Sequence, residues 1–110
     1  MGELTPAHTR KGHKMMKKEF SKIITAIRNE RGEETRRNLS FPKAMMTAAQ
    51  MEKHTATVNC GGEWGTAEST KAIAELVMND ERFVAFLEKY KATAIVETNN
   101  FKTYQIRITY

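Results

Sequence analysis

The sequence predicts an α+β fold, a small three-stranded antiparallel sheet with helices packed on one face, in the order α-α-β-α-α-β-β. Three patterns support this prediction. Apolar residues recur with a helical period of about 3.6 residues over residues 12–30. Apolar and polar residues alternate strictly over residues 102–110 and more briefly over residues 55–59. A sheet of this size buries one face most economically beneath a layer of helices.

The first element is a helix over residues 12–30, with an apolar face that faces a core and a basic face opposite. The apolar face consists of Met16, Phe20, Ile23, Ile24 and Ile27. The opposite face carries Lys11, Lys14, Lys18 and Lys22, with Lys17 and Arg28 beside them. Because the apolar face alone satisfies the core, packing does not require the lysines.

The middle of the chain contains a connector, a second helix and a strand. Residues 31–40 are strongly polar and read as a connector. Ser40 before Phe41-Pro42 resembles a helix start, because proline is tolerated in a first turn. The apolar spacing that follows predicts a helix over residues 41–53. Residues 55–59 form the first strand, and the glycines of residues 61–65 then interrupt regular structure.

Two helices follow, over residues 67–78 and 80–90. Thr66 or Ser69 is suited to cap the first of them, and Asp80 the second, because short polar side chains accept hydrogen bonds from free backbone N–H groups. Both segments carry apolar residues at helical spacing.

The sequence of the C-terminal segment predicts a β-hairpin. Asn99-Asn100 suits a two-residue turn, since asparagine tolerates positive φ. Such a turn pairs Glu97 with Lys102 and places Ile95 opposite Tyr104. We expect the apolar face of this hairpin to lie against the helices, with Ile95, Tyr104, Ile106 and Ile108 directed inward.

Length and composition restrict the class of protein. The chain has 110 residues, the size of one ordinary domain, and we expect a flexible arm over residues 1–11 followed by a single domain over residues 12–110. No apolar run reaches the roughly 20 residues of a membrane span, and the N-terminus has no signal-peptide pattern. Cys60 is the single cysteine, so no internal disulfide can form. These features predict a cytoplasmic protein without membrane attachment.

The charge is distributed unevenly. Residues 1–44 carry eleven Lys/Arg against five Glu, a net +6, whereas residues 45–110 carry seven Lys/Arg against eight Asp/Glu, a net −1. Such asymmetry favours an acidic partner, either nucleic acid or an acidic protein that handles nucleic acid. The candidate binding residues are Lys11, Lys14, Lys17, Lys18, Lys22, Arg28, Arg36, Arg37 and Trp64.

An enzymatic site is not apparent in the sequence. An extended segment between His54 and Cys60 separates them by roughly 20 Å, too far for a catalytic dyad. One cysteine and three dispersed histidines supply no metal-ligand pair. The glycine-rich segment over residues 61–65 lacks the Gly-Lys-Ser/Thr ending of a phosphate-binding P-loop. We therefore expect neither a cofactor nor a metal, although a small enzyme with an unrecognised site remains an alternative.

The leading hypothesis is a small, non-enzymatic, basic binding module, of the kind found among regulators and inhibitors of phages and other mobile elements. Two further alternatives concern binding. The element order resembles that of winged-helix DNA-binding domains. This resemblance implies a recognition helix over residues 80–90, with Arg82, Lys89 and the following Lys91 as its only candidate contacts to DNA. The other alternative is a structural subunit that self-associates as a homodimer through the exposed edge of the C-terminal strand.

Overall fold

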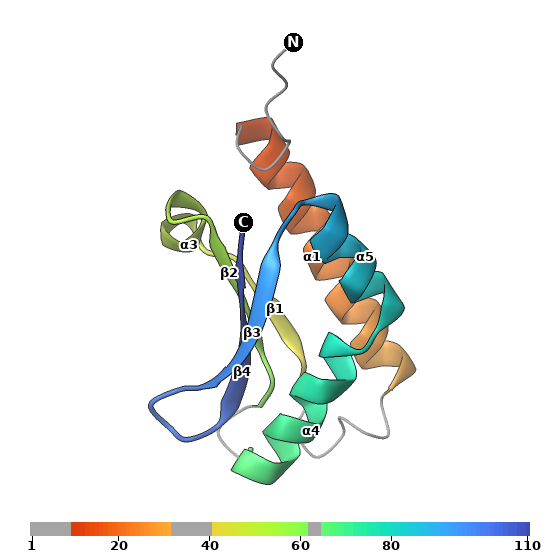
Figure 1. Ribbon diagram of the computed structural model, residues 1–110, viewed down its shortest axis with the longest axis vertical. Helices are drawn as coiled ribbons and strands as arrows, with labels where there is room; N and C mark the ends of the chain where they lie inside the picture. Colours follow the sequence, from red (N-terminus) through yellow and green to blue (C-terminus); the bar gives the residue numbers. More distant parts are fainter. Residues whose placement is uncertain (1–9, 32–40, 62–64) are drawn as a thin grey trace.

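A computed structural model describes residues 10–31, 41–61 and 65–110, with side chains from residue 14 onward (Figure 1). The chain forms, in order, α1 (Arg10–Glu30), β1 (Lys43–Met45), α3 (Ala48–Glu52), β2 (Thr55–Asn59), α4 (Ala67–Met78), α5 (Glu81–Lys89), β3 (Thr93–Thr98) and β4 (Tyr104–Thr109). The α+β class is confirmed. Helix α1 begins at Arg10, two residues before its expected start.

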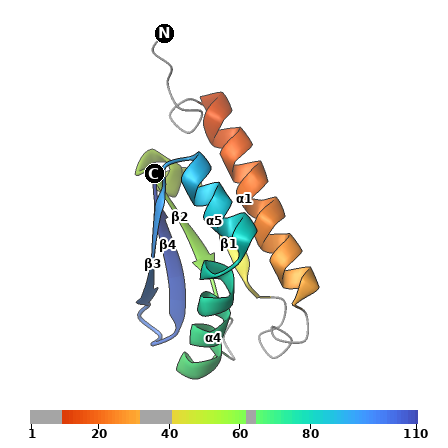
Figure 2. The same ribbon diagram turned by 45° about the vertical axis from the view of Figure 1, so that its right-hand side comes forward.

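The strands form one antiparallel sheet in the order β1-β2-β4-β3. Figures 1 and 2 show α1, α4 and α5 together on one side of this sheet. The expected sheet of three strands is therefore wrong by one strand, and the expected element order is wrong at the same place. The additional strand, β1, lies at an edge of the sheet and pairs with β2. The C-terminal strand β4 lies between β2 and β3, so the expectation that it has an exposed edge is wrong.

The error falls on residues 41–53, which were expected to be one helix. The segment instead forms β1 and then the short helix α3. Pro42 and Met46 are buried while Lys43 and Met45 are exposed, so burial alternates with the period of two that is typical of a strand. The apolar residues of this segment also fit a helical spacing, which led to the prediction of a helix. The true helix start is Thr47, whose hydroxyl accepts from the Gln50 N–H while the Gln50 side chain accepts from the Thr47 N–H.

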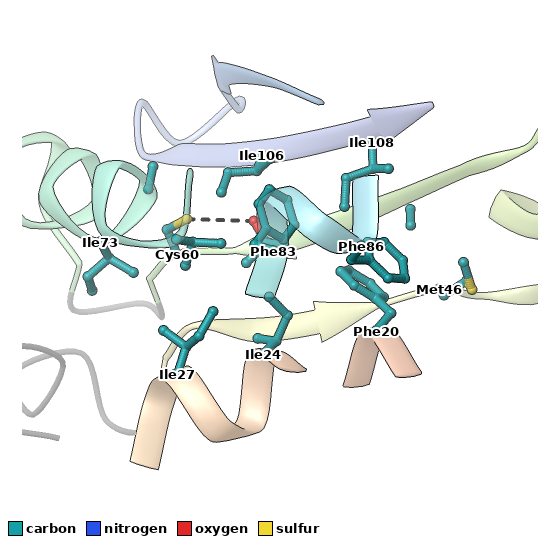
Figure 3. Close-up of a cluster of buried hydrophobic side chains, with 14 of the residues drawn as sticks. Phe20, Ile24, Ile27, Met46, Cys60, Ile73, Phe83, Phe86, Ile106 and Ile108 are labelled. Atoms are coloured by element: carbon teal, nitrogen blue, oxygen red, sulfur yellow. Dashed lines mark hydrogen bonds between the residues drawn. The ribbon is translucent and has the colours of Figure 1, made fainter. Parts of the chain in front are cut away.

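The core lies between the helical layer and the inner face of the sheet (Figure 3). Aromatic contacts join α1 to α5: the rings of Phe20 and Phe86 stack with centroids 5.6 Å apart, and Phe83 stacks on Phe86 at 6.5 Å. The expected core positions of α1 are confirmed, because Met16, Phe20, Ile24 and Ile27 are all buried. The face of α1 opposite these residues is thereby fixed toward solvent.

The two expected helix caps before α4 and α5 are confirmed. Thr66 accepts from the Ser69 N–H, and the Ser69 hydroxyl accepts in return from the Thr66 N–H. The Asp80 carboxylate accepts from the Arg82 N–H at 2.9 Å. Each cap satisfies a backbone donor that the first helical turn leaves free, which explains why the chain breaks between α4 and α5 at this point.

The C-terminal hairpin forms, but with a longer turn than expected. Glu97 pairs with Gln105 and Ile95 with Arg107, each three residues beyond the expected partner. The Asn99 side-chain oxygen accepts from the Phe101 and Thr103 N–H groups, which closes a wider turn than two asparagines would form.

The shift moves Ile95 to the outer face, where it is 50% exposed, so its expected burial is wrong. Ile106 and Ile108 are buried as expected, and Tyr104 is partly buried.

Candidate functional site

The basic face of α1 is the candidate site. We define the lysine face as Lys14, Lys17, Lys18 and Lys22, all of which are exposed. Lys14, Lys18 and Lys22 follow one another at four-residue spacing, opposite the buried residues that anchor the helix. Since a helix rises about 1.5 Å per residue, these three lysines form a row about 12 Å long.

The acidic residues of α1 do not neutralise this face. Helix α1 contains two acids, Glu19 and Glu30, and both are bound by α5. The Lys89 ammonium donates to Glu19 at 2.8 Å, and the Arg82 guanidinium forms a bidentate pair with Glu30 at 2.6 and 3.1 Å. The hydrogen bond from Arg82 lowers the pKa of Glu30, and the hydrogen bond to Glu19 raises the pKa of Lys89. Both acids are thus paired with cations of α5.

Across residues 14–31, 41–61 and 65–110, the ion pairs join Arg82 to Glu30 and Asp80, Lys89 to Glu19, and Arg107 to Glu97. None of these pairs includes a residue of the lysine face. The face therefore presents positive charge that the described part of the fold does not compensate.

The N-terminal end of α1 projects from the rest of the fold, and its backbone N–H groups add partial positive charge to that of the nearby lysines. Figures 1 and 2 show the first turns of α1 extending beyond α5 and beyond the ends of the sheet. The first turn of α1 contains no acid, although acids are preferred there because the helix N-terminus carries partial positive charge. The partial positive charge of this helix end therefore adds to the charge of the lysines nearest to it.

The remaining candidate binding residues have mixed outcomes. Arg28 lies near the C-terminal end of α1 and is half-buried. Lys11 belongs to α1, but its side chain lies outside the described residues. Arg36, Arg37 and Trp64 also lie outside the described residues.

Helix α5 occupies the position at which the winged-helix resemblance places a DNA-reading helix. Two of its three candidate contacts are held within the fold, because Arg82 bridges Glu30 and Asp80 and Lys89 binds Glu19. Lys91 is exposed and follows the end of the helix. The sequence does not reveal these pairings because they join residues 52 and 70 positions apart.

Cys60 has the environment of a structural residue. It is buried beside Phe83 and Ile106, and its thiol donates to the Val58 carbonyl at 3.7 Å (Figure 3). Burial raises the pKa of the thiol to about 12, so the nucleophilic thiolate is scarce at neutral pH. His54 precedes β2 and Cys60 follows it, at opposite ends of the strand. The described residues contain no cluster of three or more His, Cys, Asp or Glu side chains arranged for a metal.

Comparisons with known proteins add no identification. The chain matches no family model, no curated protein sequence and no solved structure. Within the described residues, every helix is too short or too polar to cross a lipid bilayer.

Proposed function

We propose that this protein is a non-enzymatic module that binds the phosphate backbone of nucleic acid through the lysine face of α1. The observation that carries the proposal is the separation of charge on this helix. Its two acids are paired with α5, while four lysines on the other side face solvent without a described counter-charge. A phosphate backbone supplies the missing anions in a regular array.

The dimensions of the lysine face suit such a backbone. The row from Lys14 to Lys22 spans about 12 Å, and one strand of B-form DNA carries a phosphate about every 3.4 Å along its axis. Three or four phosphates therefore fall within reach of the row. The flexible lysine side chains allow each ammonium to meet a phosphate without a strict register.

The chemistry of the face favours binding without base reading. Lysine is a point charge, whereas sequence-specific contacts depend mainly on the planar groups of Arg, Asn and Gln. Ser21, Thr25 and Asn29 lie exposed on the same helix and add neutral hydrogen-bonding groups. By covering the backbone, such a module would act as a regulator or inhibitor of proteins that use the same nucleic acid.

The test compares two variants of equal charge. Replacing Lys14, Lys18 and Lys22 by Gln lowers the formal net charge from +5 to +2. The matched control replaces Lys43, Lys53 and Lys71, three exposed lysines on other parts of the fold, and has the same net charge. Binding to labelled double- and single-stranded oligonucleotides is measured by fluorescence anisotropy, after thermal unfolding has shown that both variants fold.

We expect the first variant to lose binding about tenfold or more, and the control to change much less, because the contact is local rather than a general attraction between net charges. Equal losses in both variants would contradict the proposal. So would a parent protein that binds neither form of nucleic acid, a result that would instead direct the search to acidic proteins.

A further inference from the structure

Strand β3 is an open edge of the sheet. It pairs with β4 and ends the strand order, so among the described residues its outer row of backbone N–H and C=O groups has no strand beside it. Val96 points toward the helical side of the sheet and yet is 39% exposed, which shows that the helical layer does not cover this edge. Ile95, on the outer side, is 50% exposed.

The opposite edge of the sheet is protected. Strand β1 has three residues, begins with a lysine that follows a proline, and packs against α1. Short length, proline and lysine are the usual devices that prevent an edge strand from pairing with another chain. Strand β3 has six residues with the sequence Thr-Ala-Ile-Val-Glu-Thr and carries neither proline nor lysine.

We propose that β3 pairs antiparallel with β3 of a second copy of this chain, so that two sheets join into one across a twofold axis. The inference is independent of the proposed nucleic-acid function. A second copy is favoured over other extended partners by charge and by sequence symmetry. Glu97, the one charged residue of β3, is already neutralised by Arg107 at 2.8 Å.

Charge placement permits two copies to approach at this edge. Helix α1 packs against β1 at one edge of the sheet and β3 forms the other edge, so α1 and β3 lie on opposite sides in Figure 2. The two lysine faces of a β3-paired dimer therefore lie far apart at its outer ends. Although each chain carries +5, little of that charge meets across the axis.

The sequence of β3 selects one register. Residues directly opposite each other in an antiparallel pair have their side chains on the same face of the sheet. When a twofold axis perpendicular to the sheet relates the two strands, one residue at the centre must therefore pair with the same residue of the second copy. With Ile95 on the axis, Ala94 meets Val96 of the second copy and Thr93 meets Glu97. With Val96 on the axis, Ile95 would meet the charged Glu97. The first register matches apolar groups with each other and is the one we propose.

The same register explains the exposure of Phe101. Thr98 meets Ala92 of the second copy, so the hairpin tip of each chain lies beside the start of the other chain's β3. Phe101 is 85% exposed on a turn that the Asn99 side chain holds in place. An aromatic ring held in water by a well-formed turn is typical of a contact residue.

A charge exchange at Ile95 tests this dimer. In the I95E chain, the new carboxylate lies across from Arg107 within its own sheet, which favours folding, and meets an identical carboxylate across the axis. We expect the parent protein to approach twice the monomer mass as concentration rises from micromolar to millimolar in sedimentation velocity. The I95E chain should associate about tenfold or more weakly. An equimolar mixture of the I95E and I95K chains should recover a heterodimer.

The control is M45E, on the outer face of the protected edge strand, which should dimerise like the parent. A parent that stays monomeric at all these concentrations overturns the inference, as does a dimer that M45E dissociates and I95E does not. Hydrogen exchange on the parent alone gives a measurement that needs no variant. The amides of Thr93–Thr98 should exchange more slowly as concentration rises, and exchange that is independent of concentration also overturns the inference.

Discussion

The lysine face of α1 and the outer edge of β3 are both exposed, but they differ in how the fold treats their charges. On α1, the acids are drawn to one side by α5 and the lysines are left without a described partner. On β3, Glu97 is bound by both Arg107 and Gln105 at 2.8 Å, and the apolar residues Ile95 and Val96 before it are exposed. The difference shows that the fold pairs the acids of α1 and of β3 with cations, while it leaves the lysine face without a described counter-charge.

The two proposed contacts should therefore differ in their response to salt. Contacts of the lysine face with phosphate groups should weaken as salt screens both charges. Backbone pairing and apolar contact at β3 depend little on salt. Each surface can be altered without the other, because both rest on a core that neither of them enters.

The largest expected effect is on the free energy of unfolding. It distinguishes Phe86, which is buried against α1, from Phe101, which is exposed at the hairpin tip beside β3. Phe86 is 2% exposed and stacks on Phe20 of α1, whereas Phe101 is 85% exposed at the hairpin tip. We expect Phe86→Ala to lower the free energy of unfolding by about 3–5 kcal/mol, because it leaves a cavity in the core. Phe101→Ala should change it by less than about 0.5 kcal/mol in dilute solution. Urea denaturation measures both, and a large loss in the Phe101 variant would contradict its placement outside the core.

A smaller effect tests the N-cap and the ion pair of Asp80, at the start of α5. We expect Asp80→Ala to cost about 0.5–2 kcal/mol, since it removes the N-cap of α5. Asp80→Asn keeps a capping oxygen and should remain much closer to the parent at neutral pH. Thermal unfolding of the three proteins at neutral pH provides the measurement.

The same site predicts a dependence of stability on pH. Hydrogen bonds from Arg82 lower the pKa of Asp80 in the folded protein. The stabilisation is therefore present above the unfolded pKa of about 3.9 and is lost as pH falls through the lower folded value. Unfolding measured across the acid range should show a shallower loss of stability for Asp80→Asn than for the parent. Equal acid dependence in the two proteins would show that the carboxylate of Asp80 does not stabilise the fold.

The smallest expected effect concerns Cys60, which belongs to neither surface. With its pKa raised to about 12 by burial, the thiol should react with a thiol reagent only when the protein unfolds. Labelling followed over increasing urea should thus track the unfolding transition. Rapid labelling of the folded protein would contradict the burial of Cys60 and would indicate a reactive thiol.

The sequence predicts helical segments well where one period dominates. Residues of α1, α4 and α5 repeat at helical spacing, and α4 and α5 also have clear N-caps, so the positions of these helices are largely confirmed. Residues 41–53 carry apolar residues compatible with both periods, and only pairing with β2 decides in favour of a strand. The hairpin register likewise depends on the Asn99 side chain, which forms a wider turn than its sequence indicates.

The sequence predicts where the lysines of the candidate site lie, but it does not predict which residues pair with the acids of α1. The spacing of Lys14, Lys18 and Lys22 places them opposite the apolar stripe, and the structure shows them exposed. Glu19 and Glu30 pair with residues of α5 rather than with these lysines. Both pairs join distant parts of the chain, so the spacing of residues along α1 does not reveal them. Both acids flank the apolar stripe of α1, and such a position is the one sequence signal for contact with a neighbouring helix.

The most direct test of the central claim is the dependence of nucleic-acid affinity on salt. For contacts from three lysines to duplex DNA, the slope of log K against log salt concentration should be about −3, since each phosphate contact contributes about −0.9. Lys18→Gln should reduce the magnitude of this slope by about one, and Lys71→Gln should leave it unchanged. A slope near zero for the parent, or an unchanged slope for the Lys18 variant, would contradict binding through the lysine face.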